Sequence, residues 1–501
     1  MGRTEDGHNV GFERDEAKTI IKRRIKRTIN RYDKLALQDK KPYQLASNKN
    51  LVRGGQKRLN QILEQLHNSE VNTDILNRIV DYIQTADDLE LKRIQPYELA
   101  NCWDMPRQEV LKVFIHAAKA GLVTFNWDLY CPDCRTIQHT AKSLSQIHEP
   151  IHCDECEREF SVNFNKTIQL SFAPHPLIRK VNHNYFCARG PQSKPHVLAQ
   201  QYIKPGEKRF LKTQLPLGQY QLKTNRMDGT ASITVSKNGS DTVHVVLSNN
   251  GFSGEQVQIS DDPNLSLENK TDEPQVFILE RKQWVKNGVS AAEATSSQLF
   301  RNLFADEVLR KGERISVDNL TLMFTDLFDS TGMYNEEGDD RAVSQLIDHF
   351  EILQKAVADH EGAIVKTIGD SVMAVFCEPK QAFKAYLDAQ QMLSEDERFS
   401  DHLQLNAGIH HGSCMAVNLN SRIDYFGSTV NIASRFVDLA TDNEVVFSQN
   451  TFSNANLEDM LNEVGYNSTI QNTSTRLKGF NAEYFAIKSI KIDNTTLRLA
   501  I

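Results

Sequence analysis

The chain has 501 residues, eight cysteines and a formal net charge of −7. At about 150 residues per domain, this length predicts three or four domains, and the small net charge excludes a protein that is acidic or basic throughout. No apolar run approaches the ~18 residues of a membrane-spanning helix, and the first residues lack the apolar segment of a secretory signal. We therefore expect a cytoplasmic multidomain protein whose paired cysteines serve a metal rather than disulfides.

Residues 1–95 are predicted to form a basic helical region. Residues 1–60 carry sixteen Lys or Arg against seven Asp or Glu, and Ile21, Ile25 and Ile29 recur at helical spacing. A basic amphipathic helix can lie on an anionic membrane or on nucleic acid. It can also dock its isoleucine stripe on the protein and leave the basic face in water, which is the interpretation we favour.

Residues 96–157 are predicted to contain a winged-helix-like segment followed by a zinc-ribbon-like segment. The order of helix, turn at Asp104–Pro106, helix, glycine stop and strand is similar to that of a winged helix. The second helix is largely apolar and offers few Arg, Asn or Gln side chains for reading bases. We therefore expect an interaction module and no nucleic-acid partner.

Two CxxC pairs predict a metal site. Cys131 and Cys134 form the first pair, and Cys153 and Cys156 form the second. This spacing is typical of a zinc ribbon, in which four thiolates hold one tetrahedral ion. Since four thiolates leave no coordination position open, we expect a structural Zn²⁺ rather than a catalytic one. The alternative is a set of free thiols.

Residues 158–290 are predicted to form a β-rich domain. Short segments that alternate apolar and polar residues are separated by Gly, Asn and Asp, which is typical of a β-sandwich or barrel. No cluster in this segment has catalytic spacing, so a ligand-sensing role and a scaffold role both remain open. Residues 291–317 return to helical spacing at Leu299, Leu303 and Val308, and we expect a short coupling helix there.

The last segment, residues 318–495, carries the polar positions that indicate chemistry. An apolar strand ends in Asp326, and Ser330 and Thr331 then open a helix. The junction of a strand with a helix N-terminus binds anions, because several backbone N–H groups are unpaired there. Asp370 is a second carboxylate, and two carboxylates can hold divalent cations beside a nucleoside triphosphate.

A β-hairpin is predicted over Ile364–Phe376. Gly369 and Asp370 form its bend, because glycine accepts positive φ and aspartate bonds its own backbone in turns. Lys366 stands on one side of this bend. Farther along, Asn431 and Arg435 lie four residues apart on one face of a predicted helix.

Together, the strand that ends in Asp326, the KTIGD hairpin and the DYFGSTVNIASR helix resemble the catalytic domain of the class III adenylyl and guanylyl cyclases. The resemblance covers roughly residues 315–490. It implies a ferredoxin-like α/β fold, and the segments before it resemble the N-terminal region of a group of soluble bacterial cyclases. It also implies a head-to-tail homodimer in which each active site takes residues from both subunits.

The resemblance implies an adenylate cyclase that converts ATP to 3′,5′-cyclic AMP and pyrophosphate by two-metal, in-line attack of the ribose 3′-hydroxyl. The implied roles are two Mg²⁺ or Mn²⁺ ions on Asp326 and Asp370, base reading by Lys366 and Asp424, ribose and transition-state contacts by Asn431 and Arg435, and phosphate contacts by Lys478, Ser330 and Thr331.

Other functions remain open at this point. The domain can cyclise another nucleotide, GTP or a pyrimidine triphosphate, or it can be a catalytically silent nucleotide-binding regulator. Asp329 stands where the family usually carries a glycine, and a carboxylate there would repel the triphosphate unless it points to solvent or assists a metal. Peripheral contact of the basic N-terminus with a membrane remains open but is not the interpretation that we favour.

Overall fold

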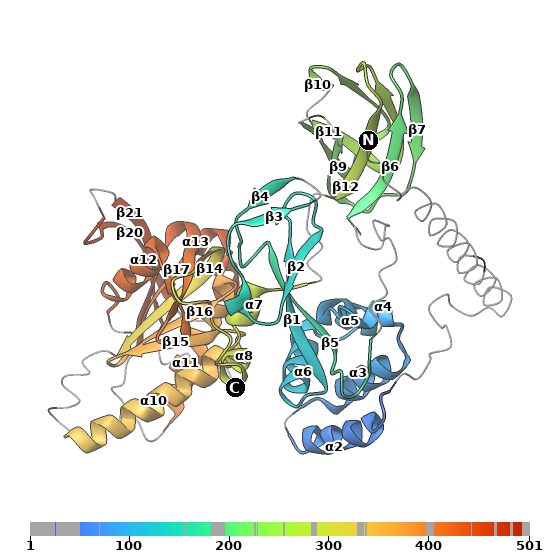
Figure 1. The fold of residues 1–501 in the computed structure, drawn as a ribbon. Helices are drawn as coiled ribbons and strands as arrows, with labels where there is room; N and C mark the ends of the chain where they lie inside the picture. Colours follow the sequence, from blue (N-terminus) through green and yellow to red (C-terminus); the bar gives the residue numbers. More distant parts are fainter. Residues whose placement is uncertain are drawn as a thin grey trace, which may run out of the picture. The chain divides into compact units, whose positions relative to one another are not determined.

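A computed structural model gives the fold (Figure 1). Apart from the single residue Lys26, the structure describes residues 51–69, 71–154, 157–181, 196–224, 227, 229–253, 256–281, 288–327, 335, 338–396, 405–441, 443–464, 468–480 and 484–492. The predicted basic helix around Ile25 lies outside these residues. The described chain falls into two compact units, of which the first comprises segments within residues 1–94, 104–125 and 172–183.

The first unit is helical. Its apolar stripes are buried at the spacing that the sequence predicted, with Leu59, Ile75 and Ile79 fully enclosed. The buried guanidinium of Arg179 donates to the carbonyl oxygen of Ala86, and so satisfies a helix end that has no partner within its own helix. The helices of this unit are α2 (Gly55–His67), α3 (Thr73–Thr85), α4 (Asp88–Leu91) and α6 (Arg107–Lys119).

The predicted order of helix, turn, helix and strand is present between residues 96 and 130. Helix α5 (Pro96–Trp103) is followed by α6 and by strand β1 (Val123–Tyr130), and Gly121, with φ of 81°, separates α6 from the strand. Strand β1 belongs to a sheet of order β13-β5-β1-β2, with β2 at Ile137–Ala141.

The other two strands of that sheet come from the segment that we assigned to the β-rich domain. They are β5 (Ile168–Pro174) and β13 (Val289–Ser290). Five of the seven residues of β5 are buried, which fits its position as an inner strand between β13 and β1. A separate ribbon of two short strands is formed by β3 (Ile151–Cys153) and β4 (Arg158–Phe160).

A second sheet surrounds its own apolar core. Its order is β6-β12-β8-β9-β11-β7, with β10 paired to β9, and Tyr220, Ile233 and Phe277 are among the buried residues that fill it. The strands are β6 (Val197–Ile203), β7 (Lys208–Lys212), β8 (Gly218–Thr224), β9 (Thr230–Ser248), β10 (Gly251–Phe252), β11 (Gln256–Asn269) and β12 (Gln275–Arg281).

The segment that we expected to be one coupling helix contains two helices and the start of a strand. Helix α7 (Ala291–Thr295) ends, and α8 (Gln298–Leu303) begins anew, because the Ser297 side chain accepts a hydrogen bond from the N–H of Phe300 and caps a second helix. Strand β14 (Arg314–Leu327) begins before residue 317.

The C-terminal region is built on an eight-stranded sheet of order β15-β16-β14-β17-β19-β21-β20, with β18 paired to β17. Its first six elements follow the order β-α-β-β-α-β with β14 and β16 in the centre, so the predicted ferredoxin-like fold is present. These elements are β14, α10 (Asp339–Asp359), β15 (Ala363–Ile368), β16 (Ser371–Phe376), α11 (Pro379–Glu395) and β17 (Leu405–Leu419).

The remaining elements extend this sheet. They are β18 (Arg422–Phe426), α12 (Ser428–Val437), β19 (Glu444–Ser448), α13 (Gln449–Asn454), α14 (Leu457–Val464), β20 (Ser468–Arg476) and β21 (Tyr484–Ile492). Met323, Phe376, Phe383 and Phe447 are members of the main core, which the sheet shares with α10 and α11. The described helices include none that is both long and apolar enough to cross a membrane.

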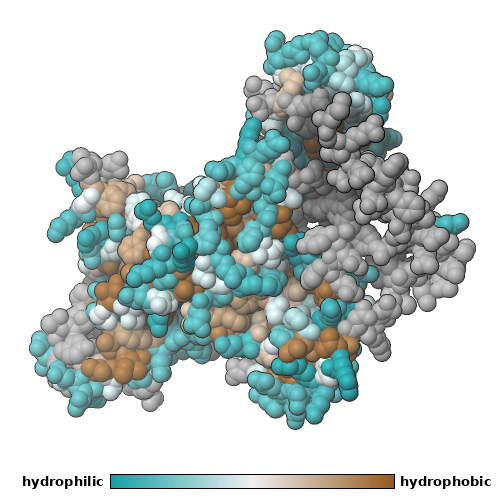
Figure 2. Space-filling model, in the orientation of Figure 1, coloured by the Kyte–Doolittle hydropathy of each residue, from teal (hydrophilic) through white to brown (hydrophobic). Residues whose placement is uncertain are grey.

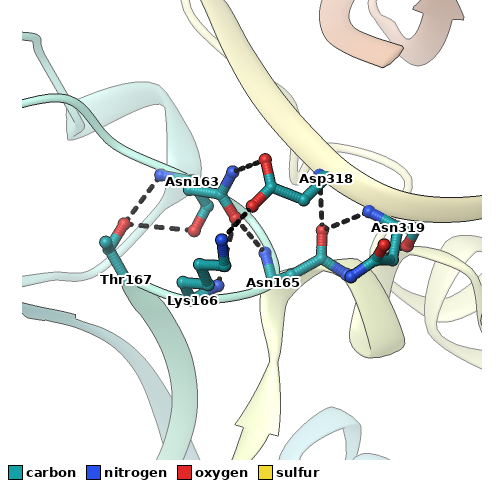
Figure 3. A network of polar contacts seen from close by, with 6 residues as sticks. All are labelled: Asn163, Asn165, Lys166, Thr167, Asp318 and Asn319. Carbon is teal, nitrogen blue, oxygen red and sulfur yellow. Dashed lines mark hydrogen bonds and ion pairs between the residues drawn. The ribbon is translucent and has the colours of Figure 1, made fainter. Parts of the chain in front are cut away.

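A bulge in β14 is held by a loop from far earlier in the chain (Figure 3). The pairing of β14 with β17 shifts between Val317 and Leu320, so Asp318 and Asn319 leave the regular ladder. The Asn165 side chain accepts from the N–H of Asp318 at 2.8 Å and from that of Asn319 at 3.3 Å. The Asn163 amide donates to the Asp318 carboxylate at 2.7 Å. The loop therefore replaces the partners that the bulge removes.

Candidate active site

The predicted hairpin places two of the candidate side chains. Strands β15 and β16 are antiparallel and pair Ile368 with Ser371, and Gly369, with φ of 66°, occupies the bend beside Asp370. Strand β16 also pairs with β14, so the hairpin lies next to the strand that ends near Asp326. The prediction of this hairpin is confirmed.

The two acidic candidates act on one another electrostatically. Burial raises the pKa of the Asp326 carboxyl, and the Asp370 and Asp438 carboxylates raise it further, whereas a hydrogen bond from Ser371 opposes them. That bond joins the Ser371 hydroxyl to Oδ1 of Asp326 at 2.5 Å. The charges of Asp326 and Asp370 are therefore close enough to repel, and such a carboxylate pair has the oxygen donors that Mg²⁺ prefers.

Lys366 and Asp424 form an ion pair. The Lys366 ammonium lies 2.7 Å from Oδ2 of Asp424, and the lysine side chain is 35% exposed while that of the aspartate is 6% exposed. The other oxygen of Asp424 accepts from the N–H of Tyr425 at 2.8 Å. The ammonium also lies 5.4 Å from the centre of the Phe426 ring. A buried carboxylate thus pairs with a partly exposed cation.

Three further candidates line one pocket. Asn431 and Arg435 on α12, and Lys478 in the turn between β20 and β21, border a cavity of about 460 Å³. The Arg435 guanidinium lies 3.1 Å from the Asp438 carboxylate in an exposed ion pair. Gly427, with φ of 143°, precedes α12 and also lines the cavity. An anionic ligand would meet two cations and an amide here.

Other candidates cannot be placed. Ser330 and Thr331, together with Asp329, lie outside the described residues, as does Cys156. The other three cysteines of the CxxC pairs gather in the second unit, and their positions are Cys131, Cys134 and Cys153.

Three residues at the site were not predicted from the sequence. Ser371 bonds Asp326, Phe426 lies beside the Lys366 ammonium, and Asp438 pairs with Arg435. The signal for Phe426 was present, because it stands two residues after Asp424 in a strand and so shares its face. No signal in the sequence marked Ser371 as a partner of Asp326.

Family comparison decides what kind of domain this is. The family described as "Adenylate and Guanylate cyclase catalytic domain" matches residues 313–488. The chain carries a class III cyclase catalytic domain. A second family, which is described as having unknown function, matches residues 56–209.

Two relatives of the cyclase domain carry adenylate cyclase names. "Adenylate cyclase 1" of Rhizobium meliloti is 30% identical over 139 residues, which are 25% of this chain and 21% of that protein. "Adenylate cyclase" of Glutamicibacter nicotianae is 30% identical over 125 residues, which are 25% of this chain and 29% of that protein. The match thus spans less than a third of either relative's length.

A solved structure, the adenylyl cyclase CyaB from P. aeruginosa, is 22% identical, with a TM-score of 0.30. The likeness covers 36% of this chain and 95% of that one.

Proposed function

We propose that this protein is an adenylate cyclase, which converts ATP to 3′,5′-cyclic AMP and pyrophosphate at sites shared by two copies of the chain. The observation that carries the proposal is the ion pair of Lys366 with the buried carboxylate of Asp424, in a cyclase catalytic domain. These two side chains supply one donor and one acceptor, the pattern that the adenine edge requires.

Base choice follows from hydrogen-bond polarity. Adenine offers an acceptor at N1 and a donor at its 6-amino group, so the Lys366 ammonium would donate to N1 and the Asp424 carboxylate would accept from the amine. Guanine presents a donor at N1 and an acceptor at O6. Its N1 donor would meet the Lys366 ammonium, which is also a donor, and its O6 acceptor would meet the Asp424 carboxylate, which is also an acceptor. A site built to bond one edge leaves buried groups unpaired with the other, and that mismatch supports ATP.

Asp326 and Asp370 are the residues that would hold divalent cations. Their mutual repulsion in the absence of a cation, which contributes to the raised pKa of Asp326, fits a metal site. Bound there, Mg²⁺ or Mn²⁺ would lower the pKa of the ribose 3′-hydroxyl and offset the charge of the triphosphate. The Ser371 hydroxyl orients the Asp326 carboxylate toward this task.

The pocket residues provide the remaining contacts. The 3′-oxygen attacks the α-phosphorus, the bond to the β-phosphate oxygen breaks, and pyrophosphate leaves. Arg435 would stabilise the charge that builds on the α-phosphoryl oxygens, because a guanidinium donates two hydrogen bonds to such groups. Its present partner, Asp438, is more than half exposed and such pairs are weak, so Arg435 can exchange it for phosphate. Asn431 would orient the ribose, and Lys478 would bind the β- and γ-phosphates.

A homodimer would complete the site. In the arrangement that the family resemblance implies, Asp326 and Asp370 of one chain face Lys366, Asp424 and the pocket of the other. Figure 2 shows apolar surface where Figure 1 places α10, and Val343 and Ile347 of this helix are 44% and 54% exposed. Exposed apolar side chains on a cyclase domain support a protein interface. With ATP as substrate and Cys102 as an exposed free thiol, we propose the cytoplasm as its location.

The test is a product assay. Purified protein is incubated with Mg²⁺ or Mn²⁺ and each of the four nucleoside triphosphates, and products are separated by chromatography, with Asp326→Ala as the control. We expect cyclic AMP from ATP and none from the variant. A cyclic product from another nucleotide alone would replace the substrate assignment. Binding without any cyclic product would favour the silent nucleotide-binding regulator.

A further inference from the structure

Three cysteines from two distant turns gather in the second unit, outside the candidate active site. The sulfur atoms of Cys131, Cys134 and Cys153 all lie within 4.8 Å of one another. Cys131 is 1% exposed and Cys153 is fully buried. The Cys134 and Cys153 sulfurs are 3.6 Å apart, well beyond the ~2.05 Å of a disulfide bond.

One backbone hydrogen bond and one positive φ recur just after each CxxC pair. After the first pair, the N–H of Arg135 donates to the carbonyl of Cys131 at 2.9 Å, and Arg135 has φ of 55°. After the second pair, the N–H of Glu157 donates to the carbonyl of Cys153 at 2.8 Å, and Glu157 has φ of 53°. Positive φ is uncommon in residues other than glycine, so its recurrence one position after each pair indicates that the same kind of turn follows both pairs.

The ribbon that carries Cys153 is too small to be stable by itself. Strands β3 and β4 have three residues each and form a sheet of their own. A lone two-stranded hairpin is marginal in water even when it is longer, and small units of this kind depend on a cross-link or a metal. The gathered sulfurs of Cys131, Cys134 and Cys153 are suited to hold such a metal.

We propose that the thiolates of Cys131, Cys134 and Cys153 bind one structural zinc ion. Binding releases the thiol protons, because thiolates are the ligands. Cys156, which lies outside the described residues, is the fourth ligand that the sequence indicates. Thiolates select Zn²⁺ over Mg²⁺ or Ca²⁺, and a tetrahedral set of four leaves no position for substrate. The ion ties the β3–β4 ribbon to the end of β1.

The tied segment leads directly to the cyclase domain. The loop that holds the β14 bulge follows β4 by only a few residues, and the N–H of Phe164 in this loop donates to the carbonyl of Ser316 in β14 at 2.9 Å. Glu307, which precedes β14, accepts from the indole N–H of Trp127 in β1 at 3.1 Å. The zinc ion therefore stabilises the segment whose loop contacts β14, the strand that carries Asp326.

Metal content tests the proposal on the full-length protein. Protein purified without chelators is analysed by inductively coupled plasma mass spectrometry, as wild type and as Cys131→Ser, Cys153→Ser and Cys156→Ser. Cys102→Ser is the matched control, because Cys102 is an exposed free thiol outside the cluster. We expect about one zinc per chain in the wild type and in the control, and its loss in the three other variants.

A second measurement does not depend on variants that fold. X-ray absorption at the zinc edge of the wild type is expected to give sulfur neighbours at about 2.3 Å and no shell of light ligands. The proposal would be overturned by a zinc-free wild type or by zinc that remains after the cysteine substitutions. A nitrogen or oxygen shell around the zinc, or a disulfide between these cysteines, would also overturn it. None of these results depends on cyclase activity, so failure here is distinct from failure of the proposed function.

Discussion

The Lys366 ammonium lies 2.7 Å from the carboxylate of Asp424, although 57 residues separate them in the chain. Strand β15 carries the lysine, and β18 carries the aspartate. In the described structure these two groups satisfy one another. Adenine inserted between them would take over both hydrogen bonds, and guanine would leave both mismatched.

Reversing this pair should change the base preference. In Lys366→Glu with Asp424→Cys, the acceptor stands where the donor was, so kcat/KM for ATP should fall by about 10²-fold or more, as expected for the loss of a few kcal/mol. Steady-state assays with ATP and GTP measure this. Lys384→Glu, on the exposed face of α11, makes the same lysine-to-glutamate change away from the pair and should leave kcat/KM unaltered. An unchanged ATP preference in the double variant would contradict base reading by the pair.

Neutralising Asp326 should separate stability from activity. Burial and the Asp370 charge raise the pKa of Asp326, so the ionised carboxylate is costly in the protein without metal. Asp326→Asn removes that charge, and the melting temperature without metal should rise at neutral pH. Cyclase activity should fall by about 10²-fold or more, because several kcal/mol of transition-state stabilisation depend on metal binding. Calorimetry and product assays check both. A variant that is less stable at every pH would argue against this charge cost.

Mixed dimers should recover activity only in certain combinations. Asp370→Ala and Lys366→Ala disrupt opposite halves of the shared site, so a heterodimer of the two keeps one intact site. An equimolar mixture that reassociates freely should give about a quarter of wild-type activity. Asp370→Ala mixed with Asp326→Ala is the control, because both changes disrupt the same half and no intact site can form. Recovery in neither mixture, or in both, would contradict a site shared in this way.

A buried histidine should make the protein sensitive to acid. His349 is fully buried, its ring nitrogens have no hydrogen-bond partner among the described residues, and burial lowers its pKa to about 4. Its unfolded value is near 6.5, so the unfolded chain binds the proton first. The free energy of unfolding should therefore fall between pH 6.5 and 4, on the order of 3 kcal/mol for this residue.

His349→Leu should flatten that dependence, as measured by urea unfolding at several pH values. His152→Gln, a change at an exposed histidine, is the control and should keep the wild-type slope. Equal slopes in the wild type and the leucine variant would show that His349 does not contribute.

The loop that holds the β14 bulge should contribute to stability (Figure 3). Asn163→Ala removes a donor to Asp318 and an acceptor for the N–H groups of Asn165 and Lys166, and should lower the free energy of unfolding by ~1–3 kcal/mol. Lys166→Ala removes a partly exposed ion pair to the same Asp318 carboxylate and should cost less than about 1 kcal/mol. Denaturant unfolding compares the two. A larger loss in the lysine variant would contradict the assigned roles.

Local features could be predicted from the sequence because neighbouring residues decide them. Gly369 and Asp370 define a bend whatever surrounds them, and the structure has the predicted hairpin at this bend. Apolar spacing alone located helices α2 and α3, and the CxxC turns brought three sulfurs together as expected. The family resemblance over residues 315–490 agrees with the matched segment, 313–488.

Contacts between distant segments were decided only by the tertiary structure. Alternation of apolar residues marked β5 as a strand, but it does not say which sheet a strand joins, and β5 pairs outside the β-rich domain. Ser371 as the partner of Asp326, and Asn165 as the partner of a bulge in β14, depend on the path of the chain. The sequence by itself predicted which side chains would carry the chemistry. The fold decided which charges meet and which are buried, because both depend on the packing of segments far apart in the chain.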